Sequence, residues 1–477
     1  MKQKFYSMAI PALVCAGIIS ACATKPDVYK KIDSAVGTAE FDKAIAEIDA
    51  AQSVPEGKEK PKNPIYPEKN TILLNLDRGM LEHYAGRYGD SYNDLTLAEQ
   101  NISAAYTKSI SQDASSYVAN DNVKDYAGED YEDVYVNIFN ALNSYHLDNG
   151  QALALMNALT AQGGKLQVLA EKYSQDGSKV EEFFETVLKA GGTVFSFGTI
   201  EWPGTAEVTF TNSALARYLS AVFCLANGNK DMARYNMFEL QNAYNTPVYS
   251  GLSVPASLAV TGERGSETGP LLDIPAGKGQ LNVLAFAGLS PVKIEKKDEM
   301  LFPFLLKYPD LASASVDIPY LQERPSAINS VSVSVEGADP FNLDLLEDLG
   351  EVLRDTFNGH QSSIYLKTFT RVLAKYVAAY IAADAAVEEA RNKNMPEMAV
   401  IAAARGPVLA AKKAIEASEA ADTRSARYLP AKAYIGAIDL DPGTYTLSIN
   451  YDGGETVTKT VEIIAGEISL VEAACLK

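Results

Sequence analysis

The spacing of apolar residues changes along this chain, and the change limits the folds that it can adopt. From about Tyr29 to Tyr249 apolar residues recur three and four positions apart, which is the period of an α-helix. Near residue 250 glycine, proline, serine and valine become frequent, and from Ala433 to Val471 apolar and polar residues alternate as in β-strands. We therefore expect an α+β protein, with a helical domain over residues 22–250 and an α+β domain over residues 251–477.

The clearest helix pair is predicted over residues 71–102, with a turn at Gly86-Arg87. Gly79 in the first helix and Ser91 in the second are small residues where the two helices cross, and Tyr88 follows the turn. This pattern resembles a tetratricopeptide (TPR) hairpin.

Further turns indicate more helix pairs. One is centred on Asn227-Gly228-Asn229, and Ala221 and Ala233 stand around it at the offsets that Gly79 and Ser91 have around Gly86. Phe41 to Ala51 resembles the second helix of a partial unit, and Asn149-Gly150 marks a weaker turn. Because these turns do not recur at a fixed period, we expect a TPR-like region of divergent helix pairs, and an irregular helical bundle is the alternative.

The first residues have the features of an export signal. Lys2 and Lys4 precede an uncharged apolar stretch from Met8 to Ala21, which is short for a membrane span. Ile19-Ser20-Ala21-Cys22 resembles the lipobox of bacterial lipoproteins. Residues 1–21 are then a signal peptide and Cys22 is the lipidation site, whereas a plain secretory signal is the alternative. No aspartate follows Cys22, which favours the outer membrane over the inner one.

The charge and the cysteines exclude several kinds of partner. The formal net charge is −19, and residues 1–21 contain two lysines and no acidic residue, so the mature chain would be more acidic still. A chain this acidic repels phosphate backbones, so we expect no nucleic-acid partner. Beyond Cys22 only Cys224 and Cys475 remain, which makes neither a disulfide framework nor a metal site, and Cys224 is expected in the core.

Two charged rows predict a helical hairpin. Its helices are expected at Leu343–Phe357 and Ser362–Ala390, joined by Asn358-Gly359-His360. The first helix carries acidic residues four apart and the second carries basic residues four apart, namely Glu347, Glu351 and Asp355 against Lys367, Arg371 and Lys375. In an antiparallel hairpin the rows would pair and set its register, although apolar packing must supply the stability. The alternative is that the basic row binds an acidic partner.

The remaining segments predict one more helix and a small sheet. The helix covers Glu397–Ala421 and is interrupted at Gly406-Pro407. Four alternating segments predict a β-meander within about residues 431–472, at Ala433–Leu440, Thr444–Tyr451, Thr456–Ile464 and Glu467–Val471. Four strands bury little, so Gln280–Ile294 or Ala327–Val335 should complete a small sheet or sandwich.

A wider resemblance rests on three stretches of sequence, continued by Ala-Asp-Thr-Arg at 421–424 and Tyr428-Leu429-Pro430. The stretches are ILLNLDRGMLEHYAGRYGDS (72–91), YTKSIS (106–111) and YAGEDYEDVYVNIFNALNSY (126–145). They are similar to an uncharacterised family of TPR-like bacterial lipoproteins, over most of the chain. The resemblance implies an envelope location and helical architecture and supplies no reaction.

Motifs of catalysis and of cofactor binding are not found in the sequence. It contains no HExxH, no GxSxG and no phosphate-binding glycine loop. His83 and His146, each before the turn of a helix pair, are expected to be structural. The acidic run Glu129–Asp133 is interpreted as the N-terminal cap of a helix, because it lacks the spacing of a calcium loop. We expect no cofactor and no metal.

These features together favour a lipid-anchored cell-envelope protein that is not an enzyme. It would act as a protein-protein interaction scaffold or accessory subunit, with the membrane and other envelope proteins as partners. The many tyrosines leave a peptidoglycan- or glycan-binding lipoprotein as the alternative. A carboxylate-dependent hydrolase is a third, less favoured reading, since paired carboxylates are common in so acidic a chain.

Overall fold

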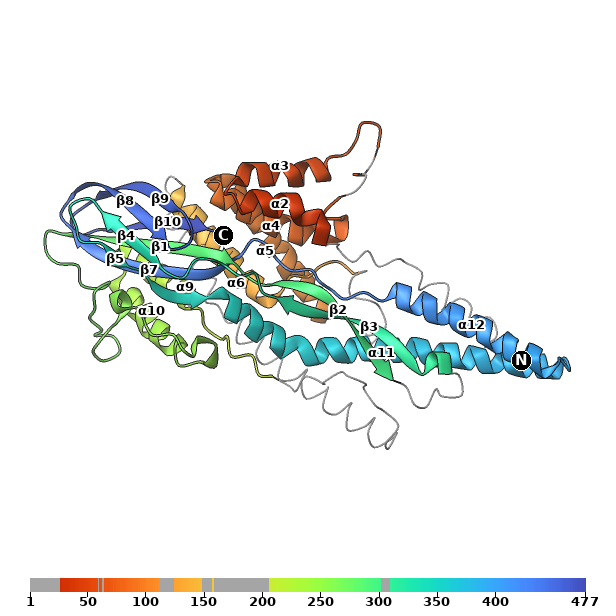
Figure 1. Ribbon diagram of the computed structural model, residues 1–477. Coiled ribbons are helices and arrows are strands. Elements are labelled where there is room, and N and C mark those ends of the chain that lie inside the picture. The colour runs from red at the N-terminus through yellow and green to blue at the C-terminus, as the bar shows by residue number, and fades with distance from the viewer. Residues whose placement is uncertain are drawn as a thin grey trace.

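The computed structural model describes residues 26–477 except 59, 62–63, 111–123, 148–156, 158–205 and 302–308. The predicted signal peptide, Cys22 and the turn at Asn149-Gly150 lie outside these residues. Figure 1 shows a body built of helices and sheets, from which one long arm projects. The prediction of an α+β protein is confirmed.

The body contains the helices expected before residue 250. They are α2 (Lys30–Val36), α3 (Phe41–Gln52), α4 (Thr71–Tyr84), α5 (Tyr88–Ile110), α6 (Asp130–His146), α9 (Ala214–Ala226) and α10 (Lys230–Ala243). Short 3-10 turns lie between them or follow them, namely η1 (Pro26–Tyr29), η2 (Glu68–Asn70), η6 (Pro247–Tyr249) and η7 (Ala256–Leu258). The pairs α2–α3, α4–α5 and α9–α10 are the helix pairs that the turns indicated.

Gly79 and Ser91 occupy the crossing of α4 and α5, as expected. The Ser91 hydroxyl donates a hydrogen bond to the Gly79 carbonyl at 2.7 Å. A Cβ on Gly79 would lie 2.8 Å from the Leu95 side chain, so only glycine permits this approach. Gly86 in the turn has a φ of 75°, which glycine adopts without strain.

Two four-stranded sheets form a sandwich in the body. The strand orders are β10-β1-β7-β6 and β5-β4-β8-β9. The strands are β1 (Gly279–Leu289), β4 (Val331–Val335), β5 (Phe341–Asn342), β6 (Asp344–Asp348), β7 (Pro430–Leu440), β8 (Gly443–Tyr451), β9 (Thr456–Ile463) and β10 (Ile468–Cys475). The apolar side chains between the sheets include Val283, Val333, Leu447 and Ile449, which are all buried.

The predicted β-meander is wrong, although its four strands exist. β7 and β10 both pair with β1, β7 antiparallel and β10 parallel, whereas β8 and β9 pair with each other beside β4. Both segments proposed to complete the sheet contribute a strand, β1 in one layer and β4 in the other, whereas Val292 to Ile294 at the end of the first segment pair outside both sheets. The reason is burial, because a sheet of four strands alone would leave one apolar face in water.

The helices of the body cover the outer face of the first sheet. Phe139 of α6 packs against Phe286 of β1 with ring centroids 5.2 Å apart. Cys224 lies in this core as expected, together with Leu284 and Ile435 from the sheet. One continuous core therefore contains residues from both sides of residue 250.

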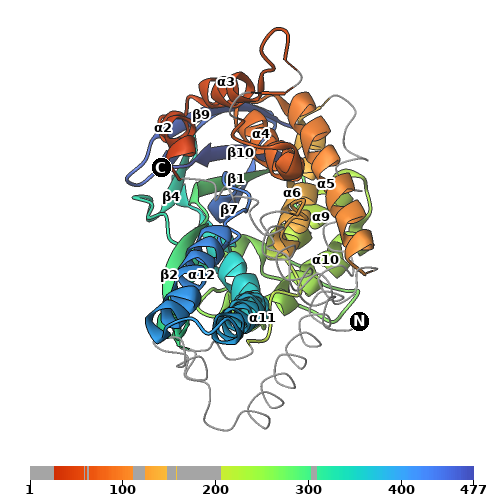
Figure 2. The ribbon, with the colours of Figure 1, turned by 90° about the vertical axis from the view of Figure 1, so that its right-hand side faces the viewer.

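The arm consists of two helices and a two-stranded ribbon. They are α11 (Leu349–Asn392), α12 (Glu397–Ser418), β2 (Val292–Leu301) and β3 (Ser313–Gln322), with η9 (Pro309–Leu311) before β3. The 44 residues of α11 span about 66 Å at about 1.5 Å per residue. Figure 2, viewed from the end of the arm, shows α11 and α12 side by side next to β2. Their shared core includes Phe369, Tyr376 and Val408.

The hairpin predicted at residues 343–390 is wrong, because α11 runs without a break through Asn358-Gly359-His360. A Cβ on Gly359 would lie 2.2 Å from Val208 Cγ2, so this glycine admits Val208 against the helix and makes no turn. The interruption predicted at Gly406-Pro407 is also wrong, since α12 continues through Pro407. Val400 and Val408, on either side of it, are both buried.

Candidate functional site

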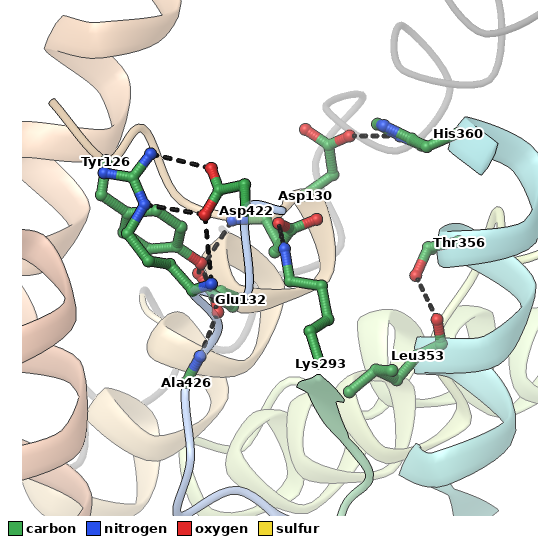
Figure 3. Close-up of polar contacts among 11 residues, drawn as sticks. Tyr126, Asp130, Glu132, Lys293, Leu353, Thr356, His360, Asp422 and Ala426 are labelled. Carbon is green, nitrogen blue, oxygen red and sulfur yellow. Dashed lines mark hydrogen bonds and ion pairs between the residues drawn. The ribbon is translucent and has the colours of Figure 1, made fainter. Parts of the chain in front are cut away.

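A cavity of about 200 Å³ lies where the arm joins the body. Its wall is formed by the start of α6, by β2 and β3, by α11 and by the segment that follows α12. Six of its lining residues carry ionisable side chains, namely Glu129, Asp130, Lys293, His360, Arg371 and Asp422. Figure 3 shows how side chains from these separate elements converge.

Two acidic residues of the wall, Glu129 and Asp130, belong to the N-terminus of α6. The Glu129 side chain accepts a hydrogen bond from the third residue of the helix, and the Glu132 side chain accepts one from the Glu129 amide. This reciprocal arrangement is a capping box, and carboxylates near a helix N-terminus are favoured by the helix dipole. The interpretation of the acidic run as a helix cap is therefore confirmed.

Nitrogen-bearing side chains from two other elements contact these carboxylates. Lys293 on β2 forms an ion pair with Glu129, and its side chain is only 7% exposed. Burial would lower the pKa of Lys293, but the charges of Glu129 and Asp422 outweigh burial and raise it. On the arm, His360 Nε2 lies 3.2 Å from Asp130 Oδ2. Both α11 and β2 of the arm are thus joined to the start of α6 through its carboxylates.

The segment after α12 is held at the same place. Arg424 pairs with Asp422 at 2.8 Å and hydrogen bonds to the Lys124 carbonyl at 2.9 Å. The Ala426 amide donates to Glu132 at 2.5 Å. Burial and then the charge of Glu129 raise the pKa of Glu132 to about 8.

The basic row of α11 has a partner that the sequence did not reveal. Arg371 Nη2 lies 2.9 Å from Glu419 Oε2, and Lys375 Nζ lies 2.6 Å from Glu419 Oε1. Arg371 and Glu419 are buried, with side chains 3% and 1% exposed. Two of the three basic residues therefore fasten the end of α12 to α11 and are not open to an acidic partner, while Lys367 is half-buried.

The acidic row does not face the basic row, so the predicted pairing is wrong. Glu347 lies in β6, where it is fully buried, and Glu351 pairs with Arg354 at 2.5 Å. Asp355 accepts hydrogen bonds from the Thr209 and Phe210 amides, both at 2.8 Å. The pairing fails because Glu347 lies on β6, and because α11 runs unbroken, so that Glu351 and Asp355 precede the basic row on the same helix.

Glu347 instead organises a buried hydrogen-bond network in the body. Tyr249 and Tyr135 donate their hydroxyls to it at 2.6 and 2.7 Å. Ser213 donates at 2.9 Å, and the Leu215 amide donates at 3.1 Å. Burial raises the pKa of Glu347, and these donors oppose the rise. The carboxylate thereby holds α6, α9 and the start of α11 together.

His83 and His146 meet at one carboxylate from the last strand of the first sheet. Glu472 Oε1 lies 2.5 Å from His83 Nε2, and Oε2 lies 3.2 Å from His146 Nε2. Burial would raise the pKa of Glu472, but both histidines hold it well below its usual range. His83 Nδ1 contacts Asn143 at 2.7 Å. These contacts tie α4 and α6 to the sheet, which agrees with a structural role.

The cavity marks the junction between the arm and the body, and its ionisable side chains have polar partners within the protein. Its Lys293, Arg371 and Asp422 side chains each pair with an opposite charge, and its His360 side chain contacts the Asp130 carboxylate. Among the described residues, no group of three or more histidine, cysteine or carboxylate side chains is arranged to hold a metal ion. What the arrangement can do is fix the direction of the arm.

The distal part of the arm exposes apolar side chains. Met398 is 82% exposed, Ile401 is 57% exposed and Ile381 is 51% exposed. Isolated apolar residues at a surface are common, but a group of them at the end of a projection is typical of an interaction site. These exposed residues were not predicted from the sequence, although their position beyond the charged rows was a usable signal.

Comparison of the chain with protein-family models, with curated proteins and with solved structures gave no match. Within the described part of the chain, no helix combines the length and the apolar character needed for crossing a membrane.

Proposed function

We propose that this protein is a lipid-anchored scaffold of the bacterial cell envelope, which binds another envelope protein through the outer face of α12 and carries out no reaction itself. The leader supports the location, since Ile19-Ser20-Ala21 before Cys22 suits lipidation at that cysteine. Ala23 after the cysteine supports the outer membrane. The helix pairs of the body fit a TPR-like region, with Gly79 and Ser91 at a close helix crossing.

The observation that carries the proposal is the apolar surface of α12. Met398, Ile401 and Leu409 are 82%, 57% and 38% exposed, and at 100° per residue they share one face. Arg405 and Lys413 are exposed on the same face. Val400 and Val408 are both buried, and Val408 belongs to the core of the arm.

The charges on this face select the partner. Arg405 contacts Asp310 only at 3.5 Å and stays 69% exposed, so most of its donors face outward. An amphipathic helix with an apolar stripe flanked by carboxylates would match both the apolar residues and the two cations. The partner is therefore an envelope protein that presents an acidic amphipathic helix.

A photoreactive amino acid at position 398 in the full chain tests the binding surface. Ultraviolet light should crosslink it to one envelope protein, and the crosslinked peptide should come from an acidic helix. Met398→Glu with Ile401→Glu should abolish co-purification of that protein. Leu97→Glu is the matched control, because Leu97 on α5 is 48% exposed on the body.

Two results would overturn this assignment. A crosslink to phospholipid would identify the bilayer as the occupant of the face. Equal co-purification by the double variant and the wild type would remove α12 from the interface.

Labelling with a fatty-acid probe tests the anchor separately. The native chain should take up the probe, and Cys22→Ala should not. If neither chain is labelled and the native protein fractionates with the cytosol, the envelope location is refuted.

A further inference from the structure

The face of α11 opposite the core of the arm carries its residues in a regular order. Its buried seam includes Phe369, Tyr376 and Ala383, which pack on α12 and β3. At 100° per residue, the opposite face carries Lys367, Ala374, Ile381 and Glu388, each seven positions after the previous one. The order along this face is cation, small residue, large apolar residue, anion.

Between its two charged ends this row consists of Ala374 and Ile381, which are both exposed, with the half-buried Thr370 beside them. Ile381 is 51% exposed, and Ala374 and Ala385 are exposed as well. Val377 and Ala378 lie between them and are half-buried. A helix that is apolar on both sides is expected to pack on both sides, and only the seam is covered in the described structure.

From this arrangement we propose that the outer face of α11 binds the same face of a second copy of the chain, with the two helices antiparallel. In the opposite direction the order is anion, large apolar residue, small residue, cation, which is complementary to the first order at every position. Lys367 of one copy then lies opposite Glu388 of the other, and Ala374 lies opposite Ile381. The two-fold axis passes between Val377 and Ala378, and each contact occurs twice.

Other arrangements put like residues together. A parallel pair would set Lys367 against Lys367 and Glu388 against Glu388, which is unfavourable. The face of α12 carries two cations, Arg405 and Lys413, and would repel its own copy. The antiparallel pair of α11 helices also places the two bodies of an acidic chain at opposite ends.

The two end charges are available for this contact. Among the residues that the structure describes, neither Lys367 nor Glu388 has an ion-pair partner, although Lys375 and Glu389 nearby both have one. The inference goes beyond the proposed function, because it assigns α11 to a second copy and leaves α12 for a different protein.

Cysteine crosslinking in the full chain tests the pairing and its direction. Oxidation of a mixture of Ala374→Cys and Ile381→Cys chains, tagged differently, should give a disulfide-linked heterodimer. Each variant alone should crosslink at least about tenfold less, because identical positions lie seven residues, or roughly 10 Å, apart along the paired helices. The wild type is the background control, since its Cys224 and Cys475 are buried.

The crosslinking distinguishes an antiparallel pair from a parallel pair and from no pair. Efficient crosslinking of Ala374→Cys with itself would show a parallel pair, and no crosslink in the mixture would show that this face does not pair. Either result overturns the proposal. Capture of the partner protein at position 398 would be unaffected, so the two proposals can fail independently.

Charge reversal adds a second readout in sedimentation of the purified full chain. Lys367→Glu and Glu388→Lys should each weaken dimer formation about threefold to tenfold, because each variant puts two like charges together across the interface. The double variant restores opposite charges and should restore dimer formation. Leu97→Glu should leave the dimer intact, and a double variant no better than the singles would contradict the antiparallel register.

Discussion

Replacing Glu132 with glutamine should change how the stability of the protein depends on pH. Glu132 is 1% exposed. Its carboxylate accepts hydrogen bonds from the Tyr126 hydroxyl at 2.8 Å, the Glu129 amide at 2.8 Å and the Ala426 amide at 2.5 Å. Burial is the main cause that raises the pKa of Glu132 from 4.5 to about 8, and the charge of Glu129 is the second. The side chain joins α6 to the segment that returns from the arm.

The direction in which pH changes the free energy of unfolding follows from proton binding at Glu132. Between about pH 4.5 and pH 8 the folded chain holds a proton at Glu132 that the unfolded chain has released, so raising the pH favours unfolding. The contribution is fully present below the unfolded pKa and is lost as the pH rises through the folded pKa. A pKa difference of this size corresponds to a loss of roughly 5 kcal/mol of unfolding free energy.

Glutamine carries no charge at any pH, so Glu132→Gln lacks this loss. At pH 5 the variant should be about 1–2 kcal/mol less stable than the wild type, because its amide group faces one of the three donors. At pH 9 the order should reverse. Urea unfolding followed by circular dichroism at 222 nm at pH 5, 7 and 9 measures the difference.

The matched control is Glu462→Gln on the exposed side of β9, which should follow the wild type at every pH. A constant difference between the unfolding free energies of Glu132→Gln and the wild type from pH 5 to pH 9 would contradict the raised pKa of Glu132.

Two further substitutions test the arm by the same urea measurement. Gly359→Ala should lower the free energy of unfolding by about 1–3 kcal/mol through its clash with Val208. Val208→Ala in the same chain should recover most of that stability. If it recovers no stability, the glycine is needed for a reason other than Val208. Glu419→Gln should lower stability by about 3–5 kcal/mol because it leaves Arg371 buried without its carboxylate. Glu416→Gln, one turn earlier and half-buried, should change it by less than about 1 kcal/mol, and equal effects would contradict the assigned role of Glu419.

The sequence predicted features whose cause is local. Gly79 and Ser91 are twelve positions apart, and the turn between their helices fixes which residues meet. The acidic run before α6 caps that helix within one turn, so its role was readable without knowledge of the fold. Strands were recognised for the same reason, since alternation of apolar residues is visible within one segment.

Features set by distant contacts were missed. Gly359 resembled a turn because its neighbour Val208 is 151 positions away in the chain. The basic row was seen, but its partner Glu419 follows a helix whose path the sequence does not state. The cavity draws Glu129, Lys293 and Asp422 from three separate regions, and no spacing rule connects them.

The unbroken course of α11 has a mechanical consequence. Its first turns, with Leu349, Val352 and Leu353, are embedded in the core of the body, while Phe369 and Tyr376 belong to the core of the arm. The chain returning from α12 is clamped at Glu419 and again at Arg424. The helix is therefore a continuous rod without a hinge. A force applied at its far end by a bound protein would act as a torque on the packing around α6 and the first sheet.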